Sequence, residues 1–131
     1  MNKMTSTEIN MDDMREIHAS FNSHDIDKIV DFFTEDGVFR LARGTDPKGR
    51  SLRGKAEIRA FLEDRFAKIG DMHWKTITEF CCGNRGVSEW MVTGTLPSGE
   101  RIEALGCDLY TFQGKKIVLK DTFWKSNEKP L

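Results

Sequence analysis

The stretch RIEALGCDLYTFQGKKIVLKDTFWK, residues 101–125, contains two runs rich in β-branched and aromatic residues on either side of Gln113-Gly114-Lys115. Such runs favour extended strands, and a short connection that contains Gly favours a hairpin between them. Two similar runs precede this stretch, at 73–82 and 87–96, and the connections at 83–86 and 97–100 contain Gly, Asn or Pro. Because every connection is short, the sequence predicts a four-stranded antiparallel meander over 73–125.

The N-terminal half has a helical period instead. Apolar residues recur three and four positions apart over 11–21, 25–33 and 58–69, which predicts three helices. A short strand is predicted at 38–41, and Gly and Pro mark 42–53 as a loop with a further short strand near Ser51-Leu52. Helices followed by a meander indicate an α+β fold with the helices on one face of the sheet. We expect one domain over residues 1–131, beginning with a flexible segment at about 1–8.

Composition and charge argue against several classes of function. Twenty Lys and Arg against 21 Asp and Glu give a formal charge of −1, so no net field attracts nucleic acid or an anionic membrane. No apolar run approaches the length of a membrane span, and residues 1–10 lack the apolar core of a signal peptide. The three cysteines, two of them adjacent, resemble neither a disulfide framework nor a metal site. We therefore expect a cytoplasmic protein without metal or cofactor, whose partner is a small molecule.

Five stretches carry a resemblance to a known family. They are, in order, FNSHDIDKIVDFFTEDGVF (21–39), GKAEIRAFL (54–62), EWMVTGT (89–95), GCDLYTF (106–112) and GKKIVLKDTFW (114–124). The chain resembles the SnoaL-like polyketide cyclase branch of the nuclear-transport-factor-two-like superfamily, which includes ketosteroid isomerases, dehydratases and epoxide hydrolases. The resemblance implies a cone in which three helices pack on a strongly curved, mainly antiparallel sheet around an internal pocket. It also implies a homodimer through the outer face of the sheet.

Asp108 is the only charged residue in the apolar stretch 104–112. Alternation along a strand puts Asp108, Tyr110 and Phe112 on one face. On an apolar, pocket-facing surface the pKa of this carboxyl would rise towards neutrality, which suits a general acid or a hydrogen-bond donor to a developing oxyanion. The resemblance supports this interpretation, because Asp108 matches the oxyanion-hole aspartate of ketosteroid isomerase. The alternative is a structural aspartate satisfied by backbone N–H groups or by a neighbouring lysine.

The same resemblance argues against steroid isomerisation. It places Leu41 at the position of the isomerase base and Ile17 at the position of its oxyanion tyrosine. Neither side chain can move a proton or donate a hydrogen bond, so two of the groups that the isomerase reaction requires are missing.

Asp121 is the second catalytic candidate, and its position depends on the register of the last hairpin. With Gly114-Lys115 as a two-residue loop, Asp121 lies opposite Asp108, and the two carboxyls form an acid/base pair. A register shifted by one residue puts Lys120 on that face instead and gives a neutralising pair. The sequence leaves both registers open.

Aromatic and apolar side chains are expected to line the pocket: Trp90, Trp124, Tyr110, Phe39, Leu41 and Ile17. His18 and His73 have side chains that titrate near neutral pH, but we expect them at a rim or on a helix surface. The basic run Lys48, Arg50, Arg53 and Lys55 is expected to be a solvated loop, the alternative being an attraction for an acidic ligand at the mouth of the cone.

These observations lead to one hypothesis and one alternative. The hypothesis is a cofactor-independent isomerase, dehydratase or cyclase that acts on a small, mainly apolar organic molecule with Asp108 as acid or hydrogen-bond donor. The alternative is a non-catalytic ligand-binding or association module. An enzyme requires an open cavity with Asp108 facing solvent or ligand, whereas a module allows protein groups to cap Asp108 and leave little free volume.

Overall fold

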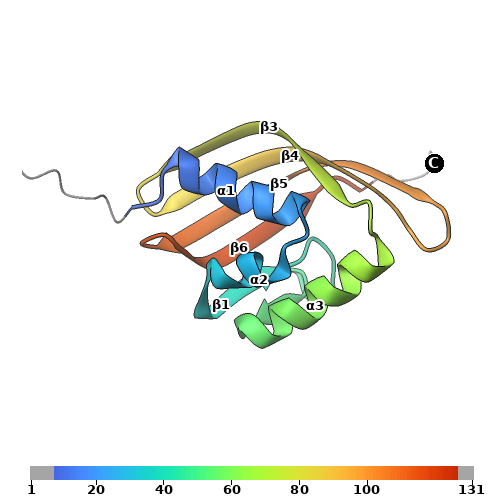
Figure 1. Cartoon of the computed structure of the whole chain (residues 1–131), viewed down its shortest axis with the longest axis horizontal. Helices are drawn as coiled ribbons and strands as arrows, with labels where there is room; N and C mark the ends of the chain where they lie inside the picture. The colour runs from blue at the N-terminus through green and yellow to red at the C-terminus, as the bar shows by residue number, and fades with distance from the viewer. Residues whose placement is uncertain (1–7, 127–131) are drawn as a thin grey trace, which may run out of the picture.

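The three predicted helices are present in the computed structural model, which describes residues 8–126. They are α1 (Met11–Asn22), α2 (Ile26–Asp31) and α3 (Gly54–Lys68), and Figure 1 shows all three on the same side of one sheet. The predicted α+β fold is confirmed. The flexible segment expected at 1–8 lies outside the described residues except for Glu8. No helix within 8–126 is long and apolar enough to cross a membrane.

The sheet has six strands, and its order brings an early strand of the chain beside the last one. The strands are β1 (Phe33–Arg40), β2 (Ser51–Arg53), β3 (His73–Cys82), β4 (Arg85–Thr95), β5 (Arg101–Gln113) and β6 (Lys116–Trp124). They lie in the order β2-β1-β6-β5-β4-β3. The predicted meander is confirmed, because β3 to β6 pair antiparallel in sequence order. β1 joins this meander by pairing parallel with β6.

The prediction of a helix over 25–33 is correct at its start and wrong at its end. The Asp25 side chain caps α2 by accepting a hydrogen bond from the Lys28 N–H at 3.2 Å. The helix ends at Asp31, and Phe33 already belongs to β1, where it pairs with Ile117 of β6. Pairing with a strand from the far end of the chain thus overrides the local helical period.

One extra residue in the last hairpin decides which side chains face the interior. The turn is Gly114-Lys115, as the first of the two predicted registers requires. The register then shifts by one between the residue pairs 112–117 and 111–119, which leaves Val118 unpaired as a β-bulge. Beyond the bulge Thr122 pairs with Asp108, and Lys120 is buried, as the second register requires. The turn therefore has the first predicted register, and the strands beyond the bulge have the second. The bulge makes both possible in one hairpin.

The core fills the space between the helices and the concave face of the sheet. Its larger cluster includes Met14, Ile17, Phe21, Phe33, Phe39, Leu62, Tyr110 and Ile117. A smaller cluster contains Ile69, Met72, Trp90 and Val92. The half-buried Trp74 packs against both clusters, so the two meet beside it.

Gly106 permits the close approach of the Trp90 ring to strand β5. A Cβ atom at this position would lie 2.6 Å from the Trp90 ring and 2.5 Å from the Phe123 carbonyl oxygen. We expect Gly106→Ala to displace Trp90 and to lower the free energy of unfolding by about 1–3 kcal/mol, measured by urea denaturation.

Gly70→Ala is the matched control for this substitution. A Cβ atom at Gly70 would meet nothing closer than the Phe66 carbonyl oxygen at 3.8 Å, which is an ordinary contact. An equal loss of stability in both variants would contradict the role assigned to Gly106.

Candidate functional site

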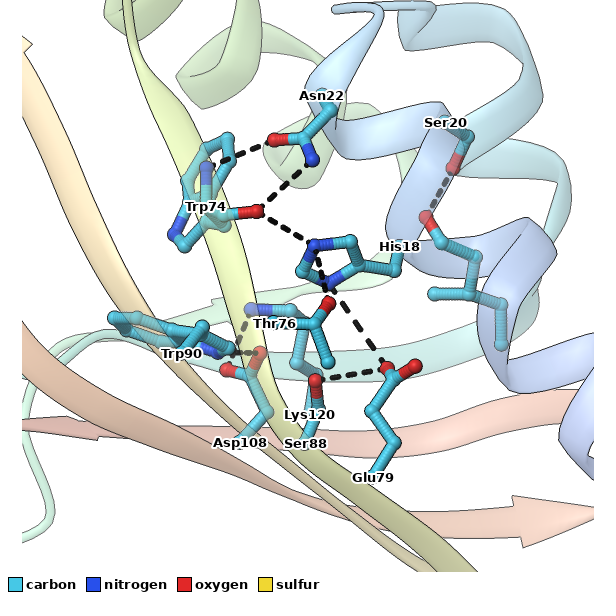
Figure 2. A network of polar contacts seen from close by, with 11 residues as sticks. His18, Ser20, Asn22, Trp74, Thr76, Glu79, Ser88, Trp90, Asp108 and Lys120 are labelled. Carbon is cyan, nitrogen blue, oxygen red and sulfur yellow. Dashed lines mark hydrogen bonds and ion pairs between the residues drawn. The ribbon is translucent and has the colours of Figure 1, made fainter.

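The Asp108 carboxylate accepts three hydrogen bonds from protein groups inside the cone. Oδ1 accepts from Lys120 Nζ at 2.8 Å and from the Thr122 hydroxyl at 2.6 Å. Oδ2 accepts from the Trp90 indole N–H at 2.9 Å (Figure 2). The side chain is buried, and both of its oxygens are in use. The carboxylate therefore acts as the acceptor of an ion pair, and it does not present a free acid to the interior.

The strand pairing brings these four residues together. Thr122 lies opposite Asp108 across β5 and β6, and Lys120 lies two positions earlier on the same face of β6. Trp90 comes from β4, where it pairs with Gly106, and the missing side chain of Gly106 lets the indole reach Asp108. The Val118 bulge sets this arrangement, since without it Asp121 would take the place of Thr122.

Lys120 is a buried cation against aromatic rings. Its Nζ lies 4.1 Å from the centroid of the Phe39 ring and 4.8 Å from that of Phe21, and it also donates to the Thr122 hydroxyl at 3.0 Å. Burial lowers the pKa of Lys120, and the attraction of Asp108 opposes that shift. Lys120 is the partner of Asp108, as in the second of the two registers that the sequence left open.

Asp121 faces away from this site. It alternates with the inward Lys120 and Thr122, and its carboxylate lies 3.5 Å from a guanidinium nitrogen of Arg40. The bulge thus removes Asp121 from the face that it would need to share with Asp108. The structure does not bring the two predicted catalytic carboxylates together.

A second polar group lies between α1 and β3 (Figure 2). His18 Nε2 is 2.7 Å from the Trp74 carbonyl oxygen and 3.0 Å from the Thr76 hydroxyl. Its Nδ1 is 3.9 Å from the Glu79 carboxylate, which accepts a hydrogen bond from Ser88 at 2.9 Å. His18 was expected at a rim or on a helix surface, and no role was predicted for Glu79.

A signal for this group was present in the sequence. His18 and Asn22 are four residues apart on α1 and therefore share a face. Asn22 bonds the backbone of Trp74 on both sides, accepting from its N–H at 2.8 Å and donating to its carbonyl at 2.9 Å. The two residues together hold α1 against the start of β3.

A small cavity of about 10 Å³ separates the two polar groups. It is lined by His18, Phe21, Trp74, Trp90, Asp108, Tyr110 and Lys120. Four titratable side chains thus converge on a space about large enough for one water molecule. Burial raises the pKa of Tyr110 well above its ordinary value, and the negative charges of Asp108 and Glu79 add to that shift.

A larger cavity of about 80 Å³ lies on the other side of Lys120. Its walls are mainly apolar, and aromatic rings are the largest group among them. The lining residues are Phe21, Phe39, Leu41, Ala42, Arg43, Phe61, Leu62, Arg65, Phe66, Met72, Trp74, Trp90, Lys120, Thr122 and Trp124. Of the residues expected to line a pocket, Phe39, Leu41, Trp90 and Trp124 lie here. Tyr110 lies at the small cavity instead. Ile17 is buried in the core and lines neither.

The described residues offer no candidate metal site. Within 8–126 no three His, Cys, Asp or Glu side chains are grouped so that they could hold a metal ion.

Tyr110 provides a direct test of this geometry because it is the only tyrosine in the chain. The ultraviolet absorbance of tyrosinate should rise only well above pH 10.0 in the folded protein and near pH 10.0 in denaturant. The raised folded pKa means that the stability contributed by Tyr110 is complete below pH 10.0 and is lost as the pH rises towards the folded value.

Tyr110→Phe is the control, since it removes the titrating group and keeps the ring. Its free energy of unfolding should fall less than that of the wild type as the pH is raised above 10.0. A folded-state midpoint at the ordinary tyrosine value would show that solvent reaches the hydroxyl.

Comparisons with known proteins agree with this architecture. Residues 14–120 match the SnoaL-like domain family. Curated protein sequences give no match.

Solved structures of the same shape cover nearly the whole chain. An NTF2-like protein from Burkholderia pseudomallei is 18% identical, with 93% of this chain and 92% of that chain covered and a TM-score of 0.78. A protein with a ketosteroid isomerase-like fold from Catenulispora acidiphila, in complex with trimethylamine, is 14% identical, covers 88% and 86%, and has a TM-score of 0.74. SalBIII, an epoxide hydrolase/cyclase-like enzyme with a role in pyran ring formation in salinomycin, is 20% identical, covers 87% and 88%, and has a TM-score of 0.74.

Likeness at these identities shows the fold and leaves the chemistry to the residues of this chain. The family match spans most of the described residues and includes β1, β4, β5 and the helices that surround the two cavities. The chain belongs to the SnoaL-like domain family, and it has the same fold as the NTF2-like and ketosteroid isomerase-like structures described above.

Proposed function

We propose that the larger cavity binds a small, mainly apolar organic molecule and directs one oxygen acceptor of that molecule to Lys120 and Thr122. The observation that carries this proposal is a buried ammonium group on the wall of a cavity that is lined mainly by aromatic and aliphatic side chains. Aromatic walls favour an apolar ring or branched group, and the single ammonium favours a carbonyl, hydroxyl or enolate oxygen beside it.

The energetics of the ion pair support a functional role for it. Removing Lys120 and Asp108 from water costs several kcal/mol per ion, and apolar residues of similar volume often stabilise a core equally well or better. A buried pair is therefore weak evidence for a purely structural role. Its position beside a cavity favours recognition of a polar group on a ligand.

The size of the cavity limits what can enter it. An engineered apolar cavity of about 150 Å³ in another protein holds benzene, and the cavity here measures about 80 Å³. A group of a few heavy atoms enters without displacing side chains. The remainder of a larger ligand would extend into the adjoining surface groove of about 430 Å³, which shares Arg43, Arg65 and Trp124 with the cavity.

Proton-transfer catalysis is the second candidate, and the small cavity is the observation that favours it. His18, Asp108, Tyr110 and Lys120 surround it, and Lys120 lines both cavities. In such an enzyme Lys120 and Thr122 would donate to a developing oxyanion, and Asp108 would hold Lys120 in position. The capping of Asp108 by three protein donors favours ligand binding over catalysis by Asp108 itself.

We also propose that the outer face of the sheet pairs with a second copy of this chain. Phe80 on β3 and Phe123 on β6 are 54% and 49% exposed, and the side chains between them on this face include Met91, Leu105 and Leu109. All three helices lie on the opposite side of the sheet (Figure 1). A two-fold contact would cover the same apolar residues on both copies.

A cytoplasmic location also stays a proposal. Cys81, Cys82 and Cys107 are all free thiols in the described part of the chain, as a reducing compartment would maintain them. Burial is the main cause that raises the pKa of the Cys81 and Cys107 thiols, which keeps both protonated and weakly nucleophilic.

The binding proposal predicts a preference for an oxygen acceptor. Cyclopentanone and methylenecyclopentane have nearly the same shape, but only the ketone accepts a hydrogen bond. We expect the ketone to bind about tenfold more tightly, since a hydrogen bond to a charged group contributes about 1.5–3 kcal/mol. Nuclear magnetic resonance shifts of the Trp90 indole N–H would report the binding.

The double variant Asp108→Asn/Lys120→Met should abolish this preference. Removing both charges avoids the cost of an unpaired buried ion, so the variant should stay folded, whereas Lys120→Met alone should lose about 3–5 kcal/mol of stability. Lys75→Met, which removes an exposed lysine on β3, is the matched control. If neither the ketone nor the alkene binds to the wild type at millimolar concentration, the proposal is wrong.

The dimer proposal predicts twice the monomer mass in light scattering at micromolar concentration. Phe80→Lys/Phe123→Lys should give a monomer with an unchanged free energy of unfolding per folded chain, because both rings are exposed. Ala67→Lys, on the exposed surface of α3, is the control that adds charge elsewhere. A monomeric wild type would refute pairing through this face.

A further inference from the structure

Two arginines lie where the larger cavity opens to the surface groove. Arg65 comes from α3 and Arg43 from the connection between β1 and β2, and both line the cavity and the groove. The charged residues that line the cavity are Arg43, Arg65 and Lys120, and all three are basic. Lys120 is neutralised by Asp108, so the remaining positive charge is at the mouth.

Within residues 8–126 Arg43 and Arg65 make no ion pair, and neither do Arg50, Arg53 and Arg85, whereas four other arginines do. Arg40, Arg59 and Arg101 each pair with an aspartate, at 3.5, 2.7 and 3.0 Å respectively. Asp64 is the neighbour of Arg65 in sequence, but its carboxylate is paired with Lys68 at 3.0 Å. The mouth thus carries two guanidinium groups without a paired carboxylate.

An aromatic ring contacts the guanidinium of Arg65, and both burial and a nearby positive charge disfavour the charged form of this side chain. Its guanidinium lies 4.7 Å from the centroid of the Phe61 ring, and the guanidinium of Arg50 lies 5.9 Å from the same ring. Burial lowers the pKa of Arg65, and the charge of Arg43 lowers it further against the opposing effect of Asp64. Like charges held near one another in a partly buried place are relieved by an anion between them.

We propose that the ligand of the cavity is an organic acid, with its apolar group inside and its carboxylate at the mouth on Arg43 and Arg65. This inference rests on the binding function proposed above and adds the charge of the ligand. The planar guanidinium matches a carboxylate with two parallel hydrogen bonds, and the partial burial of Arg65 strengthens the bonds that it donates. The groove also has acidic residues, Asp64, Glu100 and Glu103, but none of them lines the cavity.

The test compares cyclopentanecarboxylate with its neutral analogue cyclopentanecarboxamide on the full chain. We expect the acid to bind about tenfold more tightly at low salt, and added salt to weaken only the acid. Arg43→Gln and Arg65→Gln should each lower the affinity for the acid towards that of the amide and leave the amide unchanged. Arg59→Gln, whose side chain pairs with Asp27 outside the cavity, is the matched control.

The possible failures are distinguishable. Equal affinities for acid and amide, or acid binding that neither variant weakens, would overturn the inference and leave the cavity proposal in place. Absence of binding by both compounds would overturn both. Arg43 lies in an exposed connection, so Arg43→Gln gives a result even if Arg65→Gln proves unstable.

Discussion

The buried pair of Lys120 and Asp108 is the interaction on which the interior of the cone depends. Two charges within an apolar core are stable only if each finds its partner and its remaining hydrogen bonds. Trp90 and Thr122 supply those hydrogen bonds, and the rings of Phe21 and Phe39 face the ammonium. These contacts connect strands β4, β5 and β6 and helix α1 through the ion pair. The same requirement divides the interior into a small polar cavity and a larger aromatic one, because Lys120 borders both.

A single inserted residue produces this pair. Without the bulge at Val118, the two-residue turn at Gly114-Lys115 would place Asp121 opposite Asp108 and turn Lys120 outward. Two facing carboxylates would then repel each other in the core, and the cation that neutralises Asp108 would be in solvent. With the bulge, Asp108 pairs with Lys120 and does not face Asp121. The outward Asp121 pairs with Arg40. The register of the hairpin therefore determines which charges face each other in the interior, so the two cannot change independently.

The sequence was sufficient for the parts that depend on local periodicity and turns. The three helices, the meander and the inward position of Asp108 follow from apolar spacing and from Gly-containing connections. The end of α2 was missed because parallel pairing of Phe33 with Ile117 is a contact between distant parts of the chain. The partner of Asp108 stayed open because a bulge changes register without a distinct residue signal. Glu79 was missed because its contacts with His18 and Ser88 join different elements, and Arg65 because its significance comes from the cavity that it lines.

The distribution of charge around the cavities is the basis for preferring one of the proposed functions to the other. Three protein donors occupy most of the acceptor positions of the buried Asp108 carboxylate, whereas the ammonium of Lys120, which Asp108 orients, lines the larger cavity. An ammonium beside aromatic walls attracts an oxygen acceptor, and two guanidinium groups without paired carboxylates at the mouth attract an anion. A ligand with both features would neutralise the charge that the chain leaves unpaired. A protonated amine would meet three cations, so the trimethylamine found in a protein of the same fold gives no guide to the ligand of this chain.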